Sequence, residues 1–143
     1  MYTDVVKTIS RAYCHLFFHC CMGDYSPARK EAAFTAARFV EGGLNSEIDL
    51  DNEMKEYEAN RIFIKDEIHF LKYIIDVIKP ANSLTLYFYC TEIILTNGAI
   101  TGKEDQLLKN LALVLDLSHS KQHYAREIIR EVKSMESPWV YPQ

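Results

Sequence analysis

Residues 97–104 (NGAITGKE) carry three helix-boundary signals within eight positions. The Asn-Gly pair at the start is a turn signal. Thr101 is a favoured residue at the N-terminus of a helix, and Glu104 three positions later completes a capping box. Apolar segments flank the stretch at residues 84–95 and 107–115. The pattern therefore predicts two helices that are joined by a short turn.

A second stretch of the same form lies 73 residues earlier, at residues 24–31 (DYSPARKE). Each copy begins with an Asx residue, continues into a helix start and places a Lys-Glu pair in the first helical turn. The same offset pairs Leu16 with Tyr89 and Phe34 with Leu107, so that apolar positions fall on apolar positions. Two such helix-turn-helix units predict an internal repeat with a pseudo-two-fold axis.

The rest of the chain also has the pattern of helices. Residues 84–95 alternate apolar and polar side chains as a strand would, but a lone strand cannot satisfy its backbone, which favours a helix there. Periodicity and boundary signals predict helices at 3–22, 27–40, 52–79, 84–95, from Thr101 onward, and at 118–135. Residues 52–60 are polar nearly all round, so this first part of the helix 52–79 is alternatively frayed or a separate short helix. We therefore expect an all-α fold, a bundle of about five to seven helices within residues 1–135, with a C-terminal tail at 136–143.

Apolar stripes on these helices identify candidate core positions. They comprise Val6, Ile9, Tyr13, Leu16 and Cys20; Ala33, Ala36 and Ala37; Ile64, Ile68, Leu71, Ile75 and Ile78; Leu107, Leu108, Leu111 and Leu115; and Tyr124, Ile128 and Val132. Trp139 and Tyr141 are candidates to dock the tail onto the body. A homodimer is a further interpretation, with Phe17, Phe18 or Tyr87 as candidate exposed contacts.

The composition excludes several classes of protein. The chain has 143 residues, the size of one domain, and no apolar run approaches the roughly 18 residues that cross a bilayer. A net charge of −4 and a pI near 5.7 argue against a nucleic-acid binder, which needs a basic surface. The four cysteines lie inside apolar segments, and the N-terminus lacks the basic start of a signal peptide. We therefore expect reduced, buried thiols and a cytoplasmic protein without membrane insertion.

The second copy and its continuation match a known family pattern. The pattern is an apolar helix, an Asp-Gly turn, a β-branched residue, a Ser, Thr or Asp cap, a Glu three positions later, and a second apolar helix with a Leu-Gly-Leu-Ser-like break. The corresponding residues are Asn97-Gly98, Ile100, Thr101, Glu104 and Leu115-Asp116-Leu117-Ser118. The chain thus resembles the TerB-like family, which includes tellurite-resistance protein B, closely over residues 86–132 and weakly over 13–40. The resemblance implies about seven helices and a non-catalytic, stress-related binding or scaffolding role.

The resemblance also implies a divalent-cation site in paired acidic loops. Carried over by position, its residues are Asp24 and Glu31 in the first copy and Asn97 and Glu104 in the second. Such loops suit Ca²⁺, which takes six to eight oxygen ligands. In this chain Asn97 replaces the usual Asp, which removes a negative charge, and Tyr25 takes the position of the family's Gly. In the alternative interpretation, Glu31 and Glu104 simply stabilise the N-termini of their helices.

Two histidine pairs have the i, i+4 spacing of metal ligands on one helix face, His15 with His19 and His119 with His123. Two cysteines and an aspartate near the first pair make a transition-metal cluster one interpretation, and four imidazoles would converge if the two helices met. The alternative is that these are ordinary polar positions on helices, since the spacing alone is common.

Residues 41–76 are the most acidic part of the chain, with ten acidic and four basic residues and hence a charge of −6. Such a segment is either a solvated helix face or a docking surface for a basic protein partner. The chain has no Gly-rich phosphate loop and no G-x-S-x-G, H-E-x-x-H or C-x-x-C motif, so we assign no catalytic residue. The leading interpretation is a non-catalytic binding module with a protein partner at residues 41–76, and the alternative is a small metal-dependent enzyme or metal sensor.

Overall fold

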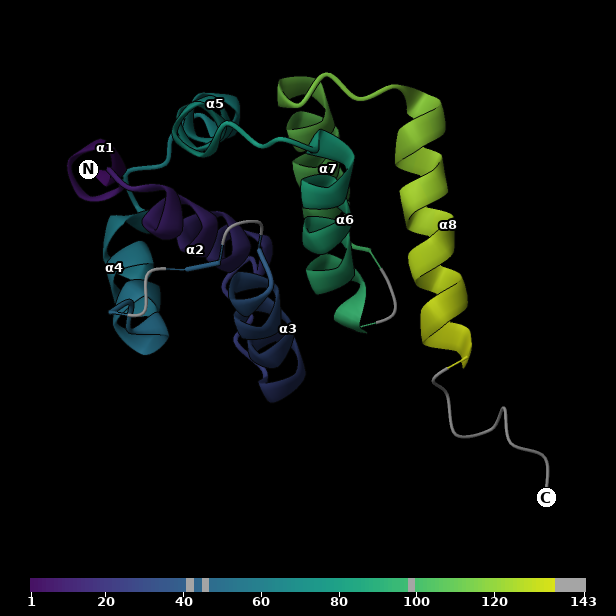
Figure 1. The fold of residues 1–143 in the computed structure, drawn as a ribbon, viewed down its shortest axis with the longest axis horizontal. Coiled ribbons are helices and arrows are strands. Elements are labelled where there is room, and N and C mark those ends of the chain that lie inside the picture. The colour runs from purple at the N-terminus through teal and green to yellow at the C-terminus, as the bar shows by residue number, and fades with distance from the viewer. Residues whose placement is uncertain (41–42, 45–46, 98–99, 136–143) are drawn as a thin grey trace.

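The computed structural model describes residues 1–40, 43–44, 47–97 and 100–135. Every regular element in these ranges is a helix, so the predicted all-α fold is confirmed (Figure 1). The elements are α1 (Tyr2–Val5), α2 (Ile9–Cys20), α3 (Pro27–Arg38), α4 (Leu50–Arg61), α5 (Glu67–Ile78), α6 (Ser83–Ile94), the 3₁₀ helix η1 (Leu95–Asn97), α7 (Gly102–Val114) and α8 (His119–Met135). No helix of the described ranges is long and apolar enough to cross a membrane. The predicted docking residues Trp139 and Tyr141 lie outside these ranges.

Helix α2 forms the centre of the core. Its residues from Ala12 to Cys20 are all buried, which means that neighbouring elements cover this helix on every side. Helices α3, α4, α5 and α6 pack against it, and Figure 1 shows α5 above α2 with α3 and α4 below it. His15 and His19 belong to this buried run, so the fold places two imidazoles in its interior.

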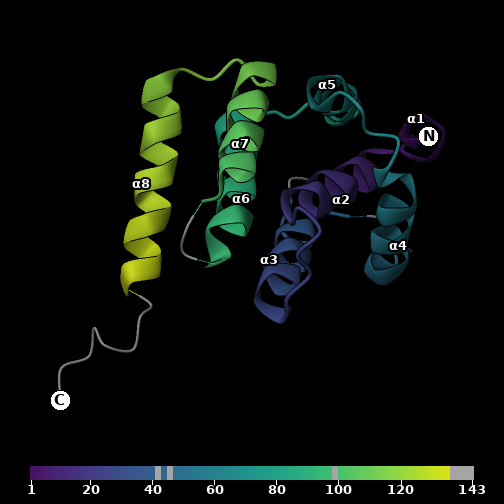
Figure 2. The same ribbon diagram turned by 180° about the vertical axis from the view of Figure 1, so that it is seen from behind.

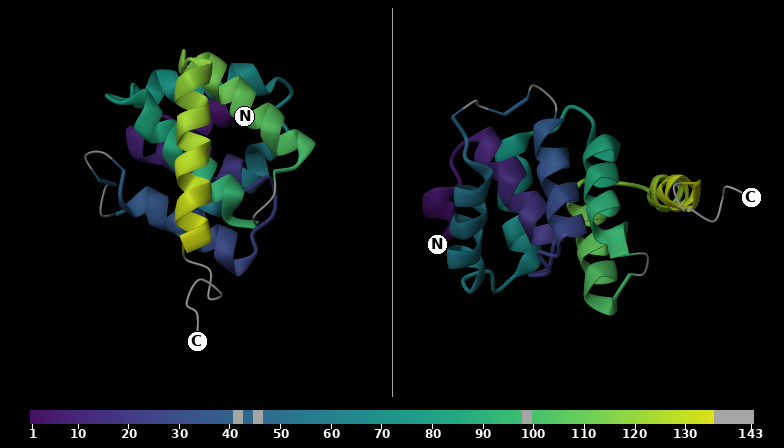
Figure 3. Two further views of the ribbon diagram at one scale, coloured as in Figure 1. Left: turned by 90° about the vertical axis from the view of Figure 1, so that its right-hand side faces the viewer. Right: turned by 90° about the horizontal axis from the view of Figure 1, so that it is seen from below.

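Helices α6, α7 and α8 form the other part of the molecule. Helix α6 contacts α2 and α3 as well as α7 and α8. Seen from behind in Figure 2, α7 covers α6. In Figure 3, α8 lies in front of the other helices in the left view and at the outer edge of the molecule in the right view. Helix α6 therefore joins the group of helices around α2 to the C-terminal pair.

The order of the helices fits the predicted repeat, but the length does not distinguish it, because all five helices from α2 to α6 have 12 residues, and the repeat stays a prediction. Helices α2 and α6 each have 12 residues and begin 74 positions apart, and each is followed by a turn and a further helix, α3 or α7. The capping box is confirmed: Thr101 Oγ1 accepts from the backbone N–H of Glu104, and the Glu104 carboxylate accepts from the N–H of Thr101. Pro27 is the first residue of α3, as its fixed φ favours.

Two of the predicted helices are wrong in extent, because each is interrupted by a capped helix start. The predicted helix 3–22 divides into α1 and α2, and the Thr8 side chain accepts from a backbone N–H in the first turn of α2. The predicted helix 52–79 divides into α4 and α5, whose first turns are capped by Asp49 and Asp66. A side-chain acceptor at this position stabilises a new helix start by about 1 kcal/mol, and apolar periodicity does not reveal it.

The buried faces of α5 and α8 also differ from the prediction. In α5 the buried side chains include Phe70 and Ile74, whereas the predicted Ile64, Ile68 and Ile75 are half-buried. The reason is that α5 packs between α2 and α7, which together cover a face rotated from the predicted stripe.

In α8, Ala125 and Ile129 are buried, whereas Tyr124 and Val132, predicted to be buried, are 59% and 47% exposed. Helix α8 packs mainly on α6, and the small side chain of Ala125 permits a close approach on that side.

The residues predicted as dimer contacts are also placed differently. Phe17, Phe18 and Tyr87 are fully buried in the core and are not on the surface.

Candidate functional site

The residues of the predicted cation site are brought together only in part, and around an arginine. Arg29 Nη1 lies 2.8 Å from Glu104 Oε2 and 3.7 Å from Asp24 Oδ2, so one carboxylate from each copy of the repeat faces the same guanidinium. The Arg29 and Glu104 side chains are 3% and 5% exposed. Arg29 also donates to the backbone carbonyls of Cys21 at 3.3 Å and Ile94 at 2.7 Å. This Arg29 junction therefore joins the ends of α2 and α6 to the first turn of α7.

The local sequence explains how these groups are positioned. Gly23 has a φ of +80°, a left-handed conformation that residues with a Cβ rarely adopt, so the turn after α2 favours glycine. Asp24 Oδ1 accepts from the backbone N–H of Ser26 at 3.0 Å and forms an Asx turn before α3. In the second copy, the capping box holds one oxygen of Glu104 at the helix start and directs the other toward the arginine.

The other two predicted ligands are placed differently. Glu31 is exposed on α3 and accepts from the hydroxyl of Thr35 at 3.4 Å, and the backbone of Asn97 ends η1. Within the described ranges, no group of three or more His, Cys, Asp or Glu side chains could hold a metal ion. The divalent-cation site at Asp24, Glu31, Asn97 and Glu104 stays a prediction.

His15 binds a carboxylate of the neighbouring helix α4. His15 Nε2 lies 3.2 Å from Glu53 Oε2, and the Glu53 carboxylate also accepts from Arg11 Nε at 3.0 Å. Burial lowers the pKa of His15, so that its imidazole is neutral at pH 7. The Nε2–H then donates to Glu53, and Nδ1 contacts no hydrogen-bond partner among the described residues. His15 is thus a buried neutral donor to a carboxylate that is shared with an arginine.

His19 connects three neighbouring helices. Its Nδ1 lies 2.8 Å from the Tyr57 hydroxyl of α4, and its Nε2 lies 2.8 Å from Glu67 Oε2 of α5. The other oxygen of Glu67 accepts from Asn110 of α7 at 2.8 Å. Burial raises the pKa of Glu67, but the hydrogen bonds from His19 and Asn110 outweigh it and hold the pKa below its usual value. The interior polar groups are therefore engaged in tying α2 to α4, α5 and α7.

The second histidine pair does not join the first. His119 and His123 are exposed on α8, whereas His15 is fully buried on α2. Figure 1 shows α8 and α2 in different parts of the molecule. The cluster of four imidazoles, which required these two helices to meet, is therefore not formed.

All four cysteines are free and buried, as predicted. Burial raises the pKa of Cys14 and Cys21 to about 12. The contact with the Cys90 thiol, together with burial, raises the pKa of Cys20 well above its usual value. Thiols with such high pKa values stay protonated at neutral pH and are poor nucleophiles, so they act as core-filling side chains.

Many acids of the segment 41–76 are used within the fold. Asp49 and Asp66 cap helices, Glu53 and Glu67 bind the buried histidines, and two further acids pair with side chains from other elements. The latter two are Asp51, which lies 3.4 Å from Lys30 Nζ, and Glu58, which accepts from the Tyr25 hydroxyl. The strong charge of this segment is therefore partly explained by internal pairing.

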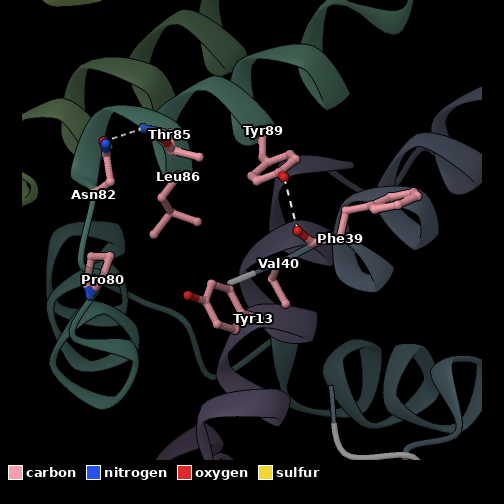
Figure 4. A pocket seen from close by; sticks show the side chains of 8 residues that line it. All are labelled: Tyr13, Phe39, Val40, Pro80, Asn82, Thr85, Leu86 and Tyr89. Carbon is pink, nitrogen blue, oxygen red and sulfur yellow. Dashed lines mark hydrogen bonds between the residues drawn. The ribbon is translucent and has the colours of Figure 1, made fainter. Parts of the chain in front are cut away.

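A half-open cavity of about 350 Å³ lies between α2, the end of α3, the loop before α6, and α6 itself (Figure 4). We call it the α3–α6 pocket. Its lining residues are Tyr13, Phe39, Val40, Pro80, Asn82, Thr85, Leu86 and Tyr89. In Figure 4, Tyr13 and Pro80 lie on one side of the pocket, and Leu86 and Tyr89 lie on the opposite side. The pocket therefore has a ring-rich wall whose exposed surface is polar and apolar in equal parts.

Two rings of the pocket are held by the core behind them. Tyr13 stacks on the fully buried Phe17 with ring centroids 6.1 Å apart, and Tyr89 meets the same ring edge-on at 6.2 Å. The Tyr89 hydroxyl donates to the backbone carbonyl of Phe39 at 3.1 Å, which ties α6 to the end of α3. These contacts fix both tyrosine rings before any ligand binds.

Sequence reasoning missed this pocket, because its lining comes from four segments that only the packing brings together. Tyr13 was expected in the core, and Pro80 follows directly after the predicted helix 52–79. The local signal that did exist is Asn82, whose side-chain oxygen accepts from the N–H of Thr85 at 3.0 Å and caps α6. That signal marks a helix start but not the cavity beside it.

No family model matches the chain, and comparisons with curated proteins and with solved structures give no match either. The features that bear on the class of this protein are therefore its helices, the Arg29 junction and the α3–α6 pocket.

Proposed function

We propose that this chain is a non-catalytic binding module of the TerB-like kind, and that the α3–α6 pocket is its binding site. The observation that carries the proposal is the lining of the pocket, which consists of three aromatic rings, three aliphatic side chains, one amide and one threonine hydroxyl. Ligand pockets usually combine apolar and aromatic side chains with a few polar groups. Of the side chains that commonly transfer protons, the described lining offers two tyrosines, and the Tyr89 hydroxyl already donates to the Phe39 carbonyl.

The use of the ionisable groups in the interior supports binding over catalysis. Arg29, His15 and His19 are each paired with a carboxylate of another element, and these pairs lie on the helix contacts around α2 and the Arg29 junction. The pairs stabilise the packing of helices, and none of these side chains lines the pocket. The ionisable side chains thus stabilise the packing of the helices, whereas the pocket is lined by rings, aliphatic side chains and two polar residues.

The TerB-like part of the proposal rests on the order of the helices and on the family motif. Helices of equal length open the two copies, and the Thr101–Glu104 capping box occupies the position that the family pattern gives it. Docking of a basic protein on residues 41–76 stays a prediction, as do a homodimer, the stress-related role and cytoplasmic location. Because many of those acids are paired with other residues of the fold, we prefer the pocket as the binding site.

The test is a screen of small molecules against the ¹⁵N-labelled chain by NMR. We expect at least one class of compound to cause saturable shifts of the amides of Tyr13, Thr85 and Tyr89, with no chemical change of the compound. Binders that cluster away from these residues, or turnover of a bound compound, would contradict a non-catalytic module with this site.

A further inference from the structure

Building on the proposed function, we infer that the α3–α6 pocket binds a small, uncharged molecule that has an aromatic ring and a carbonyl acceptor. The size of the cavity sets the first limit. An apolar cavity of about 150 Å³ can hold a benzene ring. The α3–α6 pocket, at about 350 Å³, has room for one ring and a polar substituent of moderate size. Ligands with several fused rings exceed this space.

The walls of the pocket favour an aromatic ring. Tyr13 and Tyr89 present two rings that the buried Phe17 holds from behind. Aromatic rings pair with one another in offset or edge-to-face geometry, which adds to the gain from burying their area. Because both tyrosines are already fixed, binding costs little side-chain entropy. Phe39 also lines the pocket, but its ring is 70% exposed and points away from the other lining side chains in Figure 4.

The polar end of the pocket favours a hydrogen-bond acceptor. Asn82 and Thr85 lie together at the start of α6, as Figure 4 shows. The Asn82 oxygen accepts from the Thr85 N–H with one of its lone pairs, and the N–H₂ group of the same side chain can donate to a ligand. The Thr85 hydroxyl is a second donor, and the N-terminal end of a helix carries partial positive charge. A carbonyl oxygen on the ligand complements all three.

The absence of formal charge in the described lining favours an uncharged ligand. The eight lining side chains include no Lys, Arg, Asp, Glu or His. An ionised ligand would lose part of its hydration on entry and would meet no formal opposite charge in the described lining. The partial positive charge at the start of α6 does not replace the hydration shell of a carboxylate, whereas a neutral amide would lose much less hydration. Discrimination between neutral and charged forms of one ring compound is therefore the property that identifies this class.

The experiment uses the full chain and benzamide as the probe, with benzoate and benzylammonium as charged analogues of the same size. Cyclohexanecarboxamide is the matched compound without an aromatic ring. We expect benzamide to shift the amide signals of Tyr13, Thr85 and Tyr89 in a saturable way. Both charged analogues should bind at least about tenfold more weakly, and the cyclohexane compound several-fold more weakly.

A matched pair of variants tests where benzamide binds. Thr85 is exposed, and the helix cap uses its backbone N–H and not its side chain. Thr85→Trp therefore fills the pocket while the cap remains. Ser120→Trp adds the same ring to an exposed position on α8. Thr85→Trp should abolish the benzamide shifts, and Ser120→Trp should leave them unchanged, with equal helical circular dichroism showing that both variants fold.

The outcomes separate the ligand class from the function. If the charged or the non-aromatic analogues bind as well as benzamide, or if only other compounds of the screen bind at the pocket, the inferred class is wrong and the binding module stands. If benzamide binds equally to Thr85→Trp, the site is wrong. If neither benzamide nor any compound of the screen shifts the pocket residues, the proposed function itself fails.

Discussion

Glu104→Gln tests the Arg29 junction without removing the helix cap. Glu104 uses one oxygen to accept from the Thr101 N–H at 2.9 Å and the other to pair with Arg29 at 2.8 Å. Glutamine is also accepted at the third position of a capping box, so the cap survives the substitution. What is lost is the negative charge beside a guanidinium that is 3% exposed. The variant therefore isolates the contribution of the buried charge pair.

The expected loss of stability follows from burial. Removing one partner of a buried ion pair costs about 3–5 kcal/mol where the remaining charge is uncompensated, and here Asp24, 3.7 Å from Arg29 and 43% exposed, compensates it only weakly. The glutamine carbonyl still accepts a hydrogen bond from Arg29, which restores about 1 kcal/mol. We therefore expect a loss of about 2–4 kcal/mol, a large share of the roughly 5–15 kcal/mol that stabilises a domain. At about 3 °C per kcal/mol for a chain of this size, the melting temperature should fall by about 6–12 °C.

Urea denaturation followed by helical circular dichroism measures this loss. Glu31→Gln is the matched control, because Glu31 holds the equivalent place in the first copy but is exposed. Its effect should stay within about 0.5 kcal/mol. The double variant Arg29→Met with Glu104→Gln should be less destabilised than the sum of the two single variants by at least about 1 kcal/mol. Equal effects of Glu104→Gln and Glu31→Gln, or strict additivity in the double variant, would refute the junction.

Three further predictions concern pH, the first turn and cations. Burial lowers the pKa of His15, so the folded state favours the neutral imidazole. The stability that this contributes is present above the unfolded pKa of about 6.5 and is lost as the pH falls below that value. Urea denaturation at about pH 7.5 and about pH 5.5 should show a larger loss of unfolding free energy for the wild type than for His15→Gln, and parallel losses would contradict this. Gly23→Ala should cost about 1–2 kcal/mol in the same assay because alanine is strained at a φ of +80°, and an unchanged midpoint would show that the turn relaxes. If Ca²⁺ binds the acidic loops, it must compete with Arg29 for Asp24 and Glu104, so calcium should shift the amides of these two residues at lower concentration in Arg29→Met than in the wild type. Absence of saturable shifts in both proteins would end the cation proposal.

Sequence signals within one helical turn correctly predicted features that depend on neighbouring residues. The Thr101–Glu104 capping box and Pro27 at the start of α3 were predicted at the positions where they occur, because each depends on neighbours within one helical turn. The helices 3–22 and 52–79 were predicted too long, because apolar periodicity continues across caps such as Asp66 that interrupt the backbone. Errors of this kind arise where a polar side chain, and not an apolar stripe, decides the boundary.

The candidate sites depended on packing. Asp24 and Glu104 were named as cation ligands from their place in the repeat, but Arg29, which faces both, was not named at all. The rings of Tyr13 and Tyr89 carry no local sign that they share a pocket wall. Their partner Phe17 was proposed as a surface contact and is fully buried behind them.

The sequence by itself determined that this protein is helical, where two of its helix starts lie and that its thiols are buried. Those properties follow from side-chain type and spacing over a few residues, whereas the prediction of two similar units rests on self-similarity along the chain. Tertiary structure alone decided that Arg29 lies between the two units, that the histidines of α2 bind carboxylates, and that a ring-lined pocket forms beside α6. Each of these joins residues tens of positions apart, and their meeting depends on which helix faces pack together, a choice that no local pattern in the chain encodes.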